Sequence, residues 1–98
     1  ARWGYHKICR KPGEFAESIG AFVCDLQSGV ARLVLGATDG APLQLNAVAA
    51  TVGEANGAGF DLEAARAALV ETGETFEPFK ARMHALALHR AVAQAYKT

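Results

Sequence analysis

The first half of the chain alternates apolar and polar residues with the period of β-strands. Residues 3–9 predict a short strand that carries on one face Trp3, Tyr5, Lys7 and Cys9. Pro12 and Gly13 follow this segment. They are expected to end the strand, because proline lacks a backbone donor and glycine permits a positive φ.

Two further strands are predicted between residues 18 and 37. Residues 18–24 form a nearly continuous apolar run, which is typical of a strand covered on both faces or nearly so, and Gly20 and Ala21 would let another backbone or a helix approach closely. Residues 25–29 have hairpin-turn chemistry, with Gly29 suited to a left-handed conformation. Residues 30–37 then alternate again and predict an antiparallel partner whose inward face, opposite Arg32, holds Ala31, Leu33, Leu35 and Ala37.

The second half has the period and the end signals of helices. Asn46 is expected to cap a short helix that runs to about Val52 and ends at Gly53. A glycine-rich connector then leads to Asp61, the expected N-cap of a second helix that covers residues 62–72. Gly73 is the expected stop of that helix.

The last predicted helix covers residues 78–96, with Thr75 as its cap and Pro78 in its first turn. Its apolar residues form two stripes. The longer stripe is Ala81, Ala85, Leu88, Val92 and Tyr96, and the shorter one is Phe79, Met83 and Leu86. A helix that is apolar on two sides is usually sandwiched between layers. His84 and His89 are expected to be polar edges of this helix.

Strands followed by helices predict an α+β fold, with a three-stranded antiparallel sheet followed by a small bundle of about three helices. The 98 residues are enough for one domain, which spans residues 1–98. Hydrophobic residues make up 51% of the chain, but many are alanines that bury little area each. We therefore expect a thin core that rests on the leucines and on Trp3, Phe15, Phe22, Phe60, Phe76 and Phe79.

Charge and cysteine usage exclude several classes of protein. Ten basic residues balance ten acidic ones, so the net charge favours neither nucleic acid nor an anionic membrane as a partner. No apolar run reaches the roughly 18–20 residues of a spanning helix, and the first residues given do not have the pattern of a signal peptide. We expect no membrane insertion and a cytoplasmic location, where Cys9 and Cys24 are reduced thiols.

Common catalytic and metal motifs are missing from the sequence. Its glycines form no nucleotide-binding loop. His84 and His89 lie five residues apart, about 140° around a helix, and cannot bind one metal ion from one face. Cys9 has basic neighbours but no patterned base to activate it. We therefore expect no catalytic residue and no metal ligand.

The opening segment, residues 3–16, mixes basic and aromatic side chains. Four of the ten basic residues precede the first acidic one, namely Arg2, Lys7, Arg10 and Lys11. Flat rings and cations suit a planar, electron-rich, anionic ligand, such as a flavin or single-stranded nucleic acid. An edge strand protected by its charges explains the same composition without any ligand.

Several pieces of the sequence, in order, resemble one family. Residues 5–16 carry a basic pair that is followed by Gly13-Glu14-Phe15-Ala16, and residues 18–23 form a strand of small residues. Residues 32–38 with Pro42-Leu43 supply the next strand and its loop, and residues 76–91 supply the last helix. This arrangement resembles the C-terminal domain of the FAD-binding (medium) subunit of molybdenum hydroxylases, which include bacterial carbon monoxide dehydrogenase and xanthine dehydrogenase.

The resemblance implies one part of a flavoprotein oxidoreductase. Two N-terminal domains of the same subunit would hold most of the FAD, and this C-terminal domain would close over the flavin ring. In electron transfer, electrons would pass from the molybdenum cofactor of a large subunit, through iron–sulfur clusters of a small subunit, to the flavin. The cofactor-binding residues implied by position are Tyr5, Lys7, Arg10 and Lys11.

The resemblance also limits what the chain does alone. We expect the isolated domain to bind FAD weakly or not at all and to catalyse no reaction. The reading frame is expected to extend roughly 170–190 residues upstream, by the usual size of domains. Two alternatives remain: a stand-alone protein-interaction module that uses the last helix, and a small binder of single-stranded nucleic acid that uses the opening segment.

Overall fold

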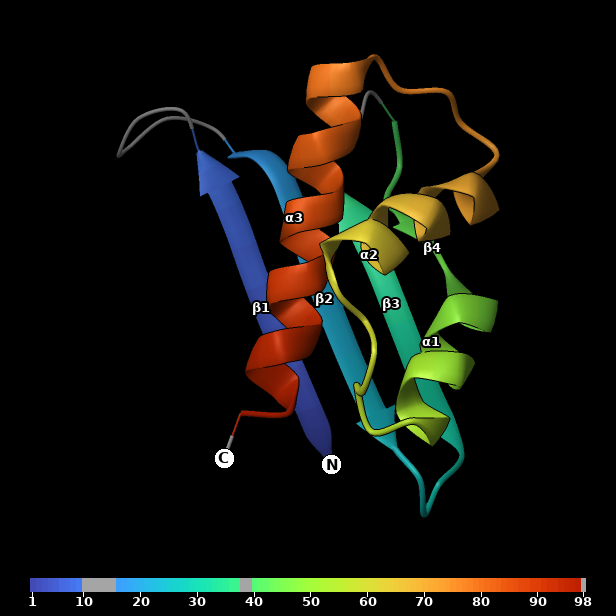
Figure 1. The fold of residues 1–98 in the computed structure, drawn as a ribbon. Coiled ribbons are helices and arrows are strands. Elements are labelled where there is room, and N and C mark those ends of the chain that lie inside the picture. Colours follow the sequence, from blue (N-terminus) through green and yellow to red (C-terminus); the bar gives the residue numbers. More distant parts are fainter. Residues whose placement is uncertain (10–15, 38–39, 98) are drawn as a thin grey trace.

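The computed structural model describes residues 1–9, 16–37 and 40–97, and its sheet is antiparallel with the strand order β1-β2-β3-β4. The strands are β1 (Arg2–Cys9), β2 (Ala16–Asp25), β3 (Val30–Gly36) and the short β4 (Leu43–Gln44). The helices are α1 (Asn46–Glu54), α2 (Leu62–Ala68) with the 3₁₀ turn η1 (Leu69–Thr72), and α3 (Pro78–Ala95). The predicted α+β class is confirmed, and β4 adds one short strand to the three expected (Figure 1).

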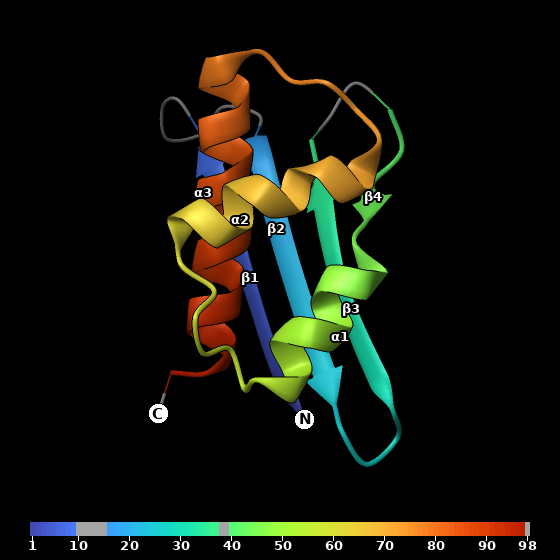
Figure 2. The same cartoon turned by 45° about the vertical axis from the view of Figure 1, so that its right-hand side comes forward.

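The helices all cover the same face of the sheet. Figures 1 and 2 show α3 lying along β1 and β2, α1 beside β3, and α2 crossing between them. The side chains of the sheet that point toward the helices are buried, chiefly Phe22, Cys24, Leu33 and Leu35. No described element covers the opposite face, so the molecule has two layers and one open sheet face.

The expectation that β2 is covered on both faces is therefore wrong. Phe22 and Cys24 are buried under the helices, whereas Ile19, Ala21 and Val23 point to the open face and are only half-buried. An apolar run in a sequence does not distinguish two covering layers from one layer and an exposed apolar face.

Small residues allow α3 to pack very close to the sheet. A Cβ atom at Gly4 would overlap the carbonyl of Ala91, and one at Gly20 would overlap the carbonyl of Ala87. The predicted close approach at Gly20 is confirmed. At Ala21 there is no such approach, because its side chain points to the open face.

The second helix has the ends that the sequence predicts. The Asp61 carboxylate accepts a hydrogen bond from the Ala64 backbone N–H at 2.8 Å. Gly73 adopts the left-handed conformation, with φ 74°, and ends the segment. Its last turn tightens into η1, so the regular α-helix is shorter than predicted.

The other two predicted caps are wrong. The side chain of Asn46 makes no cap hydrogen bond, and Glu71 supplies the acceptor for α1 instead. α1 also continues through Gly53, which is buried against Cys24. At α3 the cap is Glu77, whose carboxylate accepts from the Lys80 N–H at 3.0 Å, and not Thr75.

The core is built mainly of leucine, valine and alanine, with few aromatic residues. Phe22 is buried and Phe60 and Phe76 are partly buried against the core, as expected. Trp3 and Phe79 were wrongly expected to be core residues, since they are 67% and 65% exposed. Phe15 lies outside the described residues.

Candidate functional site

The open face of the sheet carries exposed aromatic residues. Trp3 and Tyr5 lie two residues apart on β1 and are 67% and 48% exposed. Gly4, between them, is buried on the helix side, because successive side chains of a strand point to opposite faces. The prediction that Trp3 and Tyr5 share one face with Lys7 is therefore confirmed, and that face is the open one.

A shallow depression lies on this face beside the two aromatic rings. Its volume is about 390 Å³, which falls within the range of small-ligand sites. The side chains that line it from the open face are Trp3, Tyr5, Ala21, Val23, Arg32 and Val34. Apart from the Trp3 indole N–H, the Tyr5 hydroxyl and the Arg32 guanidinium, the groups that line the depression are apolar, so the site suits a largely apolar and flat molecule.

The register of the sheet explains how three strands contribute to this depression. Trp3 pairs with Val23, which in turn pairs with Arg32. Tyr5 pairs with Ala21, which in turn pairs with Val34. Because the side chain of Ala21 is small, it leaves space between the larger side chains of Tyr5 and Val34, its partners on the two adjacent strands. No site prediction included Arg32: the alternation of residues 30–37 places it on the face opposite Leu33 and Leu35, but only the pairing with β2 brings it beside Trp3.

Helix α3 holds the part of β1 that carries Tyr5. The backbone N–H of Tyr5 donates to Oε1 of Gln94 at 2.8 Å. This bond can form because β1 is an edge strand of the sheet, so half of its N–H groups point away from β2. On the next residue, His6 Nε2 lies 3.4 Å from Nη1 of Arg90. Burial and the nearby Arg90 charge lower the pKa of His6, which favours the neutral ring as an acceptor.

The four predicted cofactor-binding residues divide into two pairs. Tyr5 and Lys7 both point to the open face, where Lys7 is exposed. Lys7 does not line the depression, but it pairs with Ile19 on the adjacent strand. Arg10 and Lys11 lie outside the described residues.

A second polar feature, Ser18 with His84, is enclosed in the interior. Ser18 Oγ and His84 Nδ1 lie 2.6 Å apart, and the two residues are 0% and 2% exposed. The ring of Phe76 packs edge-on against His84 at 4.8 Å between centroids. Burial, and then the Lys80 charge, lower the pKa of His84. The expectation that His84 is a polar edge is wrong, and its burial makes the pair a structural contact.

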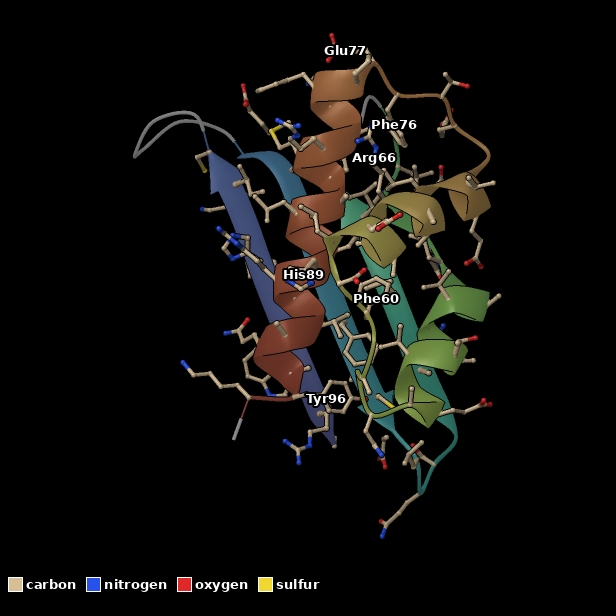
Figure 3. All side chains as sticks on the ribbon, in the orientation of Figure 1. Phe60, Arg66, Phe76, Glu77, His89 and Tyr96 are labelled. Carbon is tan, nitrogen blue, oxygen red and sulfur yellow. The ribbon has the colours of Figure 1, made fainter. Side chains whose placement is uncertain are left out.

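His89 links α3 to the connector before α2. Its Nδ1 lies 2.9 Å from the carbonyl oxygen of Phe60, and Figure 3 shows the two residues side by side. Cys9 and Cys24 are both free thiols. Within the described part of the chain, no cluster of three or more His, Cys, Asp or Glu residues is arranged to hold a metal ion.

Comparison with known proteins identifies no relative: no family model matches the sequence, and no curated protein or solved structure matches it significantly. Across residues 1–9, 16–37 and 40–97, no helix combines the length and apolar character needed to cross a membrane. Because no relative is identified, the function is inferred from the geometry and chemistry of the open sheet face.

Proposed function

We propose that this chain is the C-terminal domain of the FAD-containing subunit of a molybdenum hydroxylase-type oxidoreductase, where it closes over the flavin ring. The observation that supports the proposal is the open sheet face, on which Trp3 and Tyr5 stand beside an apolar depression. A soluble domain that exposes two aromatic rings on one face is suited to an interface or a flat ligand.

The residues of this face fit a flavin ring but not a whole FAD molecule. A phenol ring such as that of Tyr5 can pack against the flat tricyclic ring, and Ala21 leaves room beside it. Arg32 and Lys7 supply positive charge, which favours the negative charge that a flavin gains on reduction. The sequence has no glycine-rich loop for the pyrophosphate, so that part of FAD would be held by other domains.

In this proposal the partners of the domain are the N-terminal FAD-binding domains of the same subunit, the large molybdenum subunit and the small iron–sulfur subunit. The bound flavin supplies electron transfer from the iron–sulfur clusters to an acceptor. Tyr5 covers the ring, Arg32 lies beside it, and Lys7 adds positive charge farther along the same face. A cytoplasmic location belongs to the same proposal, and the chain alone catalyses no reaction.

The experiment compares the 98-residue chain with the same chain attached to its native upstream sequence. FAD titrated into the short chain should bind weakly or not at all, whereas the longer protein should purify with bound flavin. In the longer protein, Tyr5→Ala should shift the flavin reduction potential and fluorescence, while the matched change Phe79→Ala, an exposed ring on α3, should leave both unchanged.

Three results would count against the proposal. The first is micromolar FAD affinity of the short chain, with a flavin spectral shift. The second is a native reading frame that begins at this domain. The third is salt-sensitive, Tyr5-dependent binding of a thymidine oligonucleotide, which would assign the open face to single-stranded nucleic acid instead.

A further inference from the structure

The side of α3 that points away from the sheet carries a second exposed surface. It belongs to the helical layer, whereas the open sheet face is on the other side of the molecule. Phe79, Leu86 and Ala93 follow one another at seven-residue intervals. This spacing keeps them on one stripe of the helix, as in the seams through which helices pair. Phe79 is 65% exposed, Ala93 is exposed and Leu86 is half-buried, so the stripe is accessible.

By helical spacing Arg82 lies on one side of this stripe and Arg90 on the other, and Lys97 follows the C-terminal end of the helix. Arg82, Arg90 and Lys97 are all exposed, and the sequence has no acidic residue from position 78 to position 97. The neighbouring strand β1 adds Arg2, whose guanidinium lies 5.7 Å from the centre of the Tyr96 ring, and β1 contains no acidic residue. The chain as a whole has a net charge of zero, so this side of the molecule is distinctly basic.

Three occupants fit this surface poorly. A second copy that used the same face would bring Arg82, Arg90 and Lys97 against their own counterparts. A membrane requires a broad apolar face, but the broad apolar face of α3 is already buried against the sheet and includes Leu88 and Val92. The phosphates of a nucleic acid would bind the cations, but they would leave the exposed apolar stripe that begins at Phe79 without a partner.

We propose that the outer face of α3 docks an amphipathic helix of a partner protein whose apolar seam is flanked by aspartate or glutamate. The Phe79–Leu86–Ala93 stripe packs against that seam, and Arg82, Arg90 and Lys97 face the carboxylates. The open sheet face lies on the other layer, so both surfaces can be occupied together (Figures 1 and 2). This proposal does not depend on the flavin assignment.

The probe is a synthetic helical peptide of about three heptads, with leucines at its seam positions and glutamates beside them. The matched control peptide carries lysines in place of the glutamates. In NMR spectra of the ¹⁵N-labelled protein, the glutamate peptide should shift the amide signals of residues 79–97. The affinity of the lysine peptide should be lower by a factor of about ten or more.

Variants separate the docking surface from general charge effects. Arg82→Glu combined with Lys97→Glu should reverse the preference between the two peptides, and Phe79→Ser should weaken binding of the glutamate peptide. Arg66→Glu, a change at an exposed cation on α2, should leave the preference unchanged. Circular dichroism establishes that each variant is folded, and all four substituted positions are exposed, so folding should be retained.

Equal binding of the two peptides would overturn the proposal, as would shifts confined to the open sheet face. If phosphatidylglycerol vesicles bound residues 79–97 more tightly than the glutamate peptide does, the surface would be assigned to a membrane. If a thymidine oligonucleotide bound there more tightly than that peptide, the surface would be assigned to nucleic acid. Either result would also overturn the proposal.

Discussion

The carboxylate of Glu71 accepts a hydrogen bond of 2.8 Å from the backbone N–H of Ala47, which lies 24 residues earlier in the chain. Its second oxygen accepts from the N–H of Val48 at 3.0 Å. The N-terminus of α1 is thus capped by η1, a distant segment, and not by a residue of its own. This contact joins two helical segments over the β3 side of the sheet.

Glu71→Ala should therefore destabilise the fold by about 1–2 kcal/mol, because it removes both acceptors from a helix terminus. Urea denaturation followed by circular dichroism measures this change. Glu74→Ala, a nearby exposed glutamate, is the control and should have little effect. Equal destabilisation by the two variants would show that the cap does not stabilise the protein.

Burial of His84 predicts that the stability of the protein depends on pH. Its pKa is lowered by burial and by Lys80, so the folded state favours the neutral ring. The contribution to stability is complete above the ordinary value of 6.5 and is lost as the pH falls from 6.5 through the lowered pKa. The free energy of unfolding, measured by urea titration at several pH values, should therefore decrease in that window.

His84→Gln should remove most of this decrease. His6, whose pKa is also lowered, should leave a smaller remainder of the same sign. His89→Gln is the matched control on the same helix and should retain the full decrease. If His84→Gln kept the wild-type slope, the buried ring would not be the group responsible.

Close packing of α3 on the sheet predicts that a single methyl group is harmful at Gly20. A Cβ there would overlap the carbonyl of Ala87, so the helix or the strand must move. Gly20→Ala should cost about 1–3 kcal/mol. Gly40→Ala, where nothing lies within 4 Å of the new atom, should be close to neutral in the same thermal unfolding assay. Two equally stable variants would argue against the observed contact.

The single tryptophan of the chain, Trp3, reports on the open sheet face. Because it is 67% exposed, acrylamide should quench its fluorescence efficiently in the isolated chain. In a protein where other domains cover this face, the quenching of Trp3 should be markedly weaker. Protection of Trp3 in the isolated chain would contradict the open face.

Features that depend on neighbouring residues could be predicted from the sequence. The strand alternation of residues 3–9 correctly placed Trp3, Tyr5 and Lys7 on one face. Asp61 and Gly73 correctly marked the ends of the second helical segment, since a cap and a left-handed glycine act within one turn. These local preferences are set by sterics and hydrogen bonds between residues close in the chain.

Features that depend on distant residues could not be predicted. The alternation of residues 30–37 identified Ala31, Leu33 and Leu35 as the inward face of β3, whereas the inclusion of Ala37 was wrong, because the strand ends at Gly36 and Ala37 is exposed. Arg32 belongs to the candidate site only because β2 places it in line with Trp3. His84 has the spacing of a helix edge, yet it faces Ser18 at a separation of 66 residues. Glu71 gave no local signal of a cap, because its partners belong to another helix.

The sequence by itself determined the α+β class, the order of the elements and which side chains of each strand lie together. The tertiary structure alone decided that all the helices cover one face, which leaves Trp3 and Tyr5 exposed. The physical reason is that periodicity records which positions are apolar, whereas burial depends on whether another layer is present to cover them.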